Sequence, residues 1–268
     1  MPAWTKGYLD SIRERFEATT AGLGDRLDAV VDGRVAPAVD DITIGSGRSL
    51  RAAVLFFDIR GFTARTSSPE PRELRRTLLM LDCVIPMVMN VIHDHGGYVE
   101  KNTGDGVMGI IGAEGSDADA ANESLDAAAT IFYGLSNIVN PYLAQFGIAP
   151  VDARIGIDIG NLLLARIGVP SGGARQTRNF LTAVGPAANI ACRLQQLAET
   201  NEILVGDLVW QNARPNRIAA FEAATPAGWP WHHWGRTDTY WVWRFKETRT
   251  YPWDGLFLLA GILGTGER

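Results

Sequence analysis

A short run of apolar residues that ends in a carboxylate constrains this chain more than any other feature. Residues 52–57 are unbroken Ala, Val, Leu and Phe, and Asp58 follows directly. Such a run is typical of a strand buried on both faces of a sheet. A carboxylate there is costly unless it binds a cation, and the helix that opens at Gly61, Phe62 and Thr63 offers free N–H groups to a phosphate. The segment fits a metal–polyphosphate site and a simple helix cap equally well.

A second carboxylate, Asp105, lies in the turn between two short predicted strands. The strands span residues 98–103 and 107–111, and a Gly-Asp-Gly turn joins them as a hairpin. Aspartate is common in turns for local reasons. A ferredoxin-like sheet, however, would place this hairpin beside the strand of Asp58. Two carboxylates at one rim of a sheet indicate Mg²⁺ or Mn²⁺ carried in with a nucleotide.

A third polar cluster lies on a helix predicted over residues 186–199. Asn189 and Arg193 are four residues apart and therefore share one side of that helix. An amide and a guanidinium can both donate to a developing negative charge. Taken alone, the pair fits a solvated polar face at least as well.

The order of the predicted elements indicates the fold. The elements are a strand over 52–57, a helix over 74–92 kinked at Pro86, the hairpin, a helix over 117–146, and strands over 151–159 and 162–167 paired across Gly160-Asn161. This βαββαβ order predicts an α+β fold with a ferredoxin-like sheet and helices on one face. We expect a helical extension over residues 1–48, a core domain over 49–248 and a C-terminal tail over 249–268.

Composition excludes several other classes of protein. The net charge is −5 and the pI about 5.4, so no global basic field recruits nucleic acid or an acidic membrane. The two cysteines, Cys83 and Cys192, are too few for a disulfide scaffold or a cysteine zinc site. No signal-peptide core and no run of about 18 apolar residues is present. We therefore expect a cytoplasmic protein without a membrane span.

Together the three segments resemble the catalytic domain of class III adenylate and guanylate cyclases, over roughly residues 50–210. In that family, the aspartates of the F-x-D-I-x-G-F-T element and of the K-x-x-G-D hairpin bind two divalent metal ions, Mn²⁺ or Mg²⁺. The matching residues here are Asp58 and Asp105, and Ile59 would add its main-chain carbonyl. The base-recognition positions of the family match Lys101 and Thr182.

The catalytic pattern N-x-x-x-R of the family matches Asn189 and Arg193. Around it, Ala188 replaces the common Val and Pro186 a polar residue, and neither change removes a functional group. In the family, each active site forms between two subunits, with the metal-binding aspartates from one chain and the base-recognition and Asn–Arg positions from the other. The resemblance therefore implies a homodimer with two equivalent sites.

The resemblance implies conversion of a nucleoside triphosphate to a 3′,5′-cyclic monophosphate and pyrophosphate. An alternative is a catalytically inactive nucleotide-binding module, which predicts loss of a metal aspartate or of the Asn–Arg pair. Asp58, Asp105, Asn189 and Arg193 are all present. A diguanylate cyclase would carry a G-G-[DE]-E-F hairpin, which this chain lacks.

The preferred base is left open by the two recognition residues. Lys101 only donates, and every nucleobase offers it an acceptor, while Thr182 both donates and accepts. The stretch from Gly96 to Gly106 resembles the pyrimidine cyclases of Pycsar anti-phage systems, which make cyclic UMP or cyclic CMP for a separate effector. Bulky side chains at Tyr98 or at residues 180–181 would narrow the pocket. We expect UTP as the substrate, with an adenylate cyclase as the alternative.

Overall fold

The computed structural model describes residues 31–32, 42–102, 104–168 and 179–246. Most of the predicted N-terminal extension and the tail over residues 249–268 lie outside these ranges. Two parts of the extension do not form helix. The strand β1 (Val31–Asp32) runs parallel to β2 (Gly47–Ile59), and β2 itself begins inside the predicted extension. The sheet therefore begins before residue 49, where the sequence analysis placed the start of the core domain.

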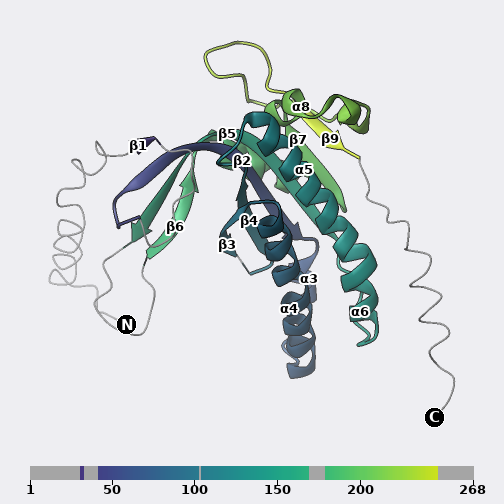
Figure 1. Ribbon diagram of the computed structural model, residues 1–268. Coiled ribbons are helices and arrows are strands. Elements are labelled where there is room, and N and C mark those ends of the chain that lie inside the picture. The colour runs from purple at the N-terminus through teal and green to yellow at the C-terminus, as the bar shows by residue number, and fades with distance from the viewer. Residues whose placement is uncertain (1–30, 33–41, 103, 169–178, 247–268) are drawn as a thin grey trace.

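A single mixed sheet forms the centre of the described chain (Figure 1). Its other strands are β3 (Tyr98–Asn102), β4 (Gly106–Ile111), β5 (Ala153–Gly168), β6 (Asn179–Val184), β7 (Glu202–Gly206), β8 (Phe221–Ala223) and β9 (Val242–Phe245). The strand order is β3-β4-β2-β5-β7-β9-β8, with β1 beside β2 and β6 beside β5. The first four strands of this order confirm the ferredoxin-like arrangement expected from the sequence.

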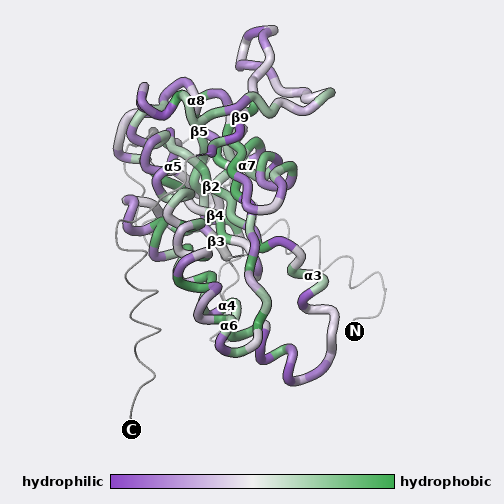
Figure 2. Tube along the Cα trace, turned by 90° about the vertical axis from the view of Figure 1, so that its right-hand side faces the viewer, coloured by the Kyte–Doolittle hydropathy of each residue, from purple (hydrophilic) through white to green (hydrophobic). Residues whose placement is uncertain are grey.

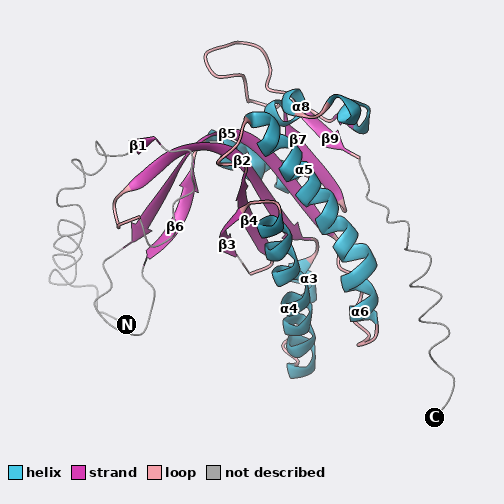
Figure 3. Ribbon diagram, viewed as in Figure 1, coloured by secondary structure: helices cyan, strands magenta, loops and turns pink. Residues whose placement is uncertain are grey.

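The helices lie on both faces of the sheet, and Figure 3 shows α4 and α5 in front of the strands. They are α3 (Phe62–Arg65), α4 (Pro71–Asp94), α5 (Asp117–Gly134), a π-helical turn η2 (Leu135–Val139), α6 (Asn140–Ala144), α7 (Pro186–Leu197), α8 (Asp207–Asn212) and a 3₁₀ turn η3 (Pro215–Ala220). Helices α4 and α5 bury one face, and α7 packs on the other. The prediction of helices on one face only was wrong. It followed from the βαββαβ order, which does not include α7.

The two faces of β2 follow the alternation of its side chains. Leu55, Phe57 and Ile59 enter the larger core under α4 and α5, whereas Val54 enters the smaller core on the α7 face. Asp58 therefore lies on the α7 face. Figure 2 shows the hydrophobic segments gathered at the centre of the molecule.

Helix α4 continues without interruption through Pro86. It is also the one helix among the described residues whose length and composition would allow it to cross a membrane. Six of its residues are buried, and Met80, Val84, Val88 and Ile92 pack into the larger core. That packing is what a core helix of a folded domain requires.

The hairpin expected at Gly160-Asn161 is wrong. Residues 153–168 form one continuous strand, β5, which pairs with β2 along its length. Gly160 lets helix α7 pack close to β5 and does not form a turn. A Cβ at position 160 would lie 3.2 Å from the Cβ of Ala187 on α7. Asn161 projects outward, where its Oδ1 accepts a hydrogen bond from Arg51 at 3.3 Å.

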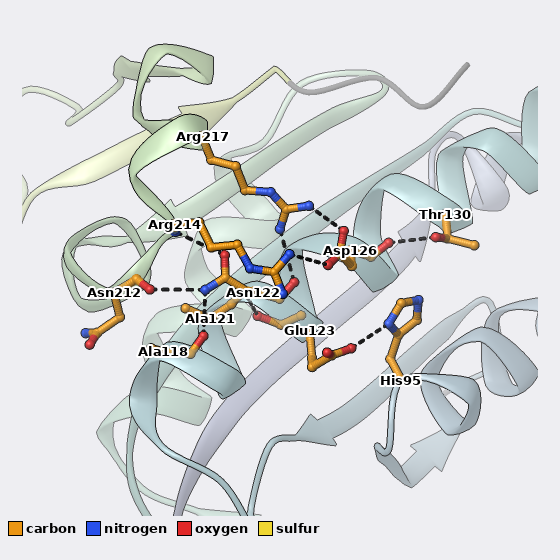
Figure 4. A network of polar contacts seen from close by, with 11 residues as sticks. His95, Ala118, Ala121, Asn122, Glu123, Asp126, Thr130, Asn212, Arg214 and Arg217 are labelled. Carbon is orange, nitrogen blue, oxygen red and sulfur yellow. Dashed lines mark hydrogen bonds and ion pairs between the residues drawn. The ribbon is translucent and has the colours of Figure 1, made fainter. Parts of the chain in front are cut away.

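A buried polar network attaches the C-terminal elements to α5 (Figure 4). Asp126 accepts a hydrogen bond from Arg217 of η3. Asn122, which is 4% exposed, accepts the main-chain N–H of Arg214 at 3.1 Å and donates to the carbonyl of Asn212 at 3.3 Å. Buried groups of this kind are costly unless paired. The network therefore fixes where α8 and η3 lie, on the α5 side of the sheet.

Candidate functional site

Asp58 and Asp105 lie at the same rim of the sheet. Asp58 lies opposite Gly106 in the antiparallel pairing of β2 with β4. Beyond this pair, the N–H of Ile59 donates a hydrogen bond to the main-chain carbonyl of Asp105, the residue before β4, at 3.2 Å. Asp58 and Asp105 are both half-buried. The turn that precedes β4 thus holds Asp105 beside the end of β2.

An arginine that the sequence analysis missed pairs with Asp58. Arg154 lies directly opposite Asp58 where β5 pairs with β2. Its Nε and Nη2 each lie 2.8 Å from Asp58 Oδ2. Its Nη1 donates to the main-chain carbonyl of Gln196 at the end of α7, at 3.1 Å. The guanidinium is therefore held at the rim by the sheet on one side and by α7 on the other.

The charges at this rim suit a cation. Burial raises the pKa of Asp105, and the negative charge of Asp58 raises it further, while its own backbone and Arg154 oppose the shift. A divalent ion beside Asp105 would favour the charged form of this carboxylate. Among the described residues, no group of three or more His, Cys, Asp or Glu side chains could hold a metal. Two carboxylates fit Mg²⁺ or Mn²⁺ that keeps waters and phosphate oxygens as its other ligands.

The predicted phosphate-binding segment follows Asp58 directly. Gly61 has φ of 69°, a left-handed conformation that glycine adopts readily, and it reverses the chain into α3. Helix α3 is one turn long. Phe62 packs against the larger core, and Thr63 is exposed. This places the N–H groups of the turn next to the rim that carries the carboxylates.

The two predicted base-recognition residues lie on strands that are joined by a side chain. Lys101 on β3 lies opposite Met108 on β4, and Thr182 on β6 lies opposite Ala165 on β5. Glu100, the residue before Lys101, accepts the main-chain N–H of Ala183 at 3.1 Å. The sheet curves so that β3 and β6 lie side by side in space. The fold therefore brings the Lys101 and Thr182 positions together.

Helix α7 carries Asn189 and Arg193 on its exposed side. It begins at Pro186, as its sequence predicts, and it lies close on β5 because Gly156 has no side chain. A Cβ at that position would overlap the carbonyl oxygen of Ala191. Arg193 Nη1 donates to Gln196 Oε1 at 3.3 Å. Gln196 thereby links Arg193 to the guanidinium that pairs with Asp58.

The far side of α7 rests on a core built by the C-terminal strands. Ile190 and Leu194 pack with Tyr240 and Val242. Beneath them, the Tyr240 hydroxyl donates to Asp158 Oδ1 at 2.6 Å, and full burial raises the pKa of Asp158 to about 8. Asp158 belongs to the support of α7 and lies apart from the rim of Asp58.

Comparison with known proteins identifies the family. Residues 46–226 match the family model of the adenylate and guanylate cyclase catalytic domain. This is more than half of the chain. The chain belongs to that family. The cyclase domain is also similar in fold to the crystal structures of the guanylyl cyclase Cya2 (TM-score 0.61, 21% identity, covering 77% of this chain and 96% of that one) and of the adenylyl cyclase CyaB from P. aeruginosa (0.60, 21%, 76% and 97%).

The relatives of known sequence are named for different cyclase activities. An adenylate cyclase from Anabaena cylindrica is 27% identical over 184 residues, which are 66% of this chain and 34% of that protein. A cytidylate cyclase from Escherichia coli is 26% identical over 160 residues, 57% of this chain and 33% of that protein. The cyclase domain thus spans about a third of the length of these two relatives.

Proposed function

We propose that this chain is a nucleotidyl cyclase, which converts a nucleoside triphosphate to a 3′,5′-cyclic monophosphate and pyrophosphate. The observation that carries the proposal is the convergence of Asp58 and Asp105 at one rim, in a chain that also presents Asn189 and Arg193. In the reaction, the 3′-oxygen bonds to the α-phosphorus and its proton leaves. The bond from the α-phosphorus to the oxygen of the β-phosphate breaks, and pyrophosphate departs.

The residues of the chain have distinct tasks in this proposal. Asp58, Asp105 and the Ile59 carbonyl would hold two divalent ions, which lower the pKa of the 3′-hydroxyl and screen the triphosphate. The Arg193 guanidinium would stabilise the charge that develops on the transferring phosphoryl group. Asn189 would hold the ribose in position for attack.

We also propose that the active enzyme is a homodimer with sites shared between subunits. Its support is an apolar surface on the β5–β6 ribbon. Ile167 and Phe180 are directly opposite each other and are 56% and 69% exposed, and Val184 on the same side of β6 is 51% exposed. Thr182 lies between the last two. Exposed apolar surface of this kind marks an interface, and a second copy covering it would bury a base-recognition residue.

Shared sites predict rescue between two inactive variants. A heterodimer of Asp58→Ala and Arg193→Ala subunits would contain one site with both lesions and one with neither. Mixing the two proteins 1:1 should therefore restore about a quarter of wild-type activity. Product formation is measured after the subunits have exchanged, with heterodimers quantified by native mass spectrometry. Heterodimers that form and stay inactive would contradict sites of this composition.

For the substrate we propose UTP, with cyclic UMP read by a separate effector in cytoplasmic anti-phage signalling. The support is the likeness of the Tyr98–Gly106 stretch to pyrimidine cyclases and the cytidylate cyclase among the relatives. Leu181 faces the smaller core and Tyr98 packs against it, so neither is free to line a pocket beside Thr182; Phe180 shares the side of β6 that carries Thr182. The adenylate cyclase relatives favour ATP as the second candidate.

The deciding experiment incubates the purified protein separately with ATP, GTP, CTP and UTP in Mn²⁺ and identifies the products by mass spectrometry. We expect cyclic UMP as the dominant product. Dominant cyclic AMP would overturn the pyrimidine assignment and leave the cyclase mechanism in place. If none of the four nucleotides is cyclised, the inactive binding module replaces the enzyme as the best account of the chain.

A further inference from the structure

Glu100 occupies an irregular position in the sheet. The pairing of β3 with β4 shifts its register between Val99 and Lys101, and Glu100 lies at this irregularity. An irregularity of this kind, a β-bulge, turns a side chain in a direction that a regular strand would not allow. The Glu100 side chain is buried, at 9% exposure, and points to β6.

The atom that Glu100 reaches is part of the base-recognition strand. Glu100 Oε1 accepts the main-chain N–H of Ala183 at 3.1 Å, across 83 residues of sequence. Strand β6 pairs only with β5 among the described strands. The Glu100 side chain adds a hydrogen bond to β6 from outside that pairing. Hydrogen bonds to a carboxylate are stronger than those between neutral groups.

Each of the two bonded residues, Glu100 and Ala183, is next in sequence to a proposed base-recognition residue. Lys101 follows Glu100 directly, and Thr182 precedes Ala183. The Ala183 side chain is buried in the smaller core, so Thr182 points to the opposite side of β6. Any slide of β6 relative to β3 would change the spacing between the Lys101 and Thr182 positions, and the bond from Glu100 resists that slide.

We propose that Glu100 is a positioning residue that sets the selectivity of the site among nucleobases. The inference rests on the proposed function, because it assumes that Lys101 and Thr182 contact the base. Glu100 itself contacts neither the substrate nor the reacting atoms. Its task is to hold the two recognition strands at one spacing, so that only one base finds donors and acceptors at both positions.

The test compares Glu100→Ala with Glu100→Gln and with a matched control. Gln keeps a carbonyl oxygen for the Ala183 N–H, and Ala does not. Glu100→Ala should lower the ratio of kcat/KM for the preferred nucleotide over the other three by about tenfold, which is typical of a lost hydrogen bond to a charged group. The loss should lie in KM, with kcat changed less than about threefold, because Asn189 and Arg193 are undisturbed. Glu100→Gln should restore most of the ratio.

The control is Asn122→Ala. Asn122 is also buried and also accepts a main-chain N–H at 3.1 Å, from Arg214, but it lies in the network on α5 (Figure 4). Its loss should lower the melting temperature and leave the ratio among bases unchanged. A Glu100→Ala enzyme that keeps its base ratio, or a Glu100→Gln enzyme that behaves like Glu100→Ala, would overturn the inference.

Two further measurements separate this inference from the proposed function. Hydrogen exchange reports the Ala183 amide directly, and it should be faster in Glu100→Ala than in the wild type or in Glu100→Gln. Equilibrium binding of the four triphosphates reports base selectivity without turnover. A wild-type protein that binds but does not cyclise would defeat the proposed function, and its binding ratios would still decide the role of Glu100. A wild-type protein that binds all four equally would defeat the inference.

Discussion

Asp58→Ala should abolish cyclic-nucleotide formation, with a loss of at least about 10³-fold, because several kcal/mol of metal-dependent stabilisation depend on the carboxylates at the rim. The replacement removes one of the two acidic ligands proposed for the metal and leaves Arg154 beside Asp105, so the rim becomes less negative and should hold a divalent cation less well. Product is measured by mass spectrometry across a Mn²⁺ titration. Binding of Mn²⁺ to the protein with nucleotide, followed by electron paramagnetic resonance, should weaken in parallel.

The control for this change is another carboxylate at the same end of the sheet. Asp152 precedes β5 and accepts a hydrogen bond from Asn201 at 2.7 Å. Asp152→Ala should keep activity within a few-fold of the wild type and keep Mn²⁺ binding. Thermal melting shows whether each variant is folded. A folded Asp58→Ala protein with full activity would remove the metal assignment from this rim.

Arg193→Ala should lower turnover by about 10²–10³-fold while changing nucleotide affinity little, since a donor aimed at charge in the transition state acts mainly on kcat. Arg193 is exposed on α7, and it donates a hydrogen bond to the exposed side chain of Gln196, so its removal leaves no buried group unpaired. Stability should therefore stay near the wild-type value. Arg193→Lys should not restore turnover, because an ammonium lacks the planar fork of donors.

The control for Arg193→Ala is the same substitution at an arginine outside the proposed site. Arg236 is exposed and its Nη1 lies 3.8 Å from Asp238 Oδ2, in the segment between β8 and β9. Arg236→Ala should leave kcat and affinity unchanged. Equal losses of kcat and of affinity in Arg193→Ala would assign Arg193 to ground-state binding of the triphosphate in place of the transition state.

The sequence was sufficient to predict the fold class because its strands and helices differ in hydrophobic period. The apolar run before Asp58 and the hairpin around Asp105 were placed correctly, and their strands are neighbours in the sheet. The error at Gly160 has a physical cause. A glycine that ends an alternating strand and a glycine that lets a helix approach look the same in one sequence, and only the packing of Ala187 distinguishes them.

The candidate site could be predicted where one short motif holds its residues, and not where pairing between distant strands creates a contact. Asp58 and Asp105 each lie in a recognisable segment. Arg154 reaches Asp58 only through the register of β5 against β2, and Glu100 reaches Ala183 only through a bulge. Neither the register of distant strands nor a bulge leaves a periodic pattern in the sequence.

The long pairing of β2 with β5 also has a consequence for how the chain acquires its site. The paired residues are 94 apart at one end (Ile59 with Ala153) and 118 apart at the other (Gly47 with Ala165). Loop closure over such distances is slow, and contacts of this kind dominate folding times. During synthesis, Asp58 and Asp105 leave the ribosome well before Arg154, so the partner that balances their charge arrives last. The rim is thus assembled across 96 residues of sequence, and a nascent chain carries two carboxylates without this partner until β5 docks.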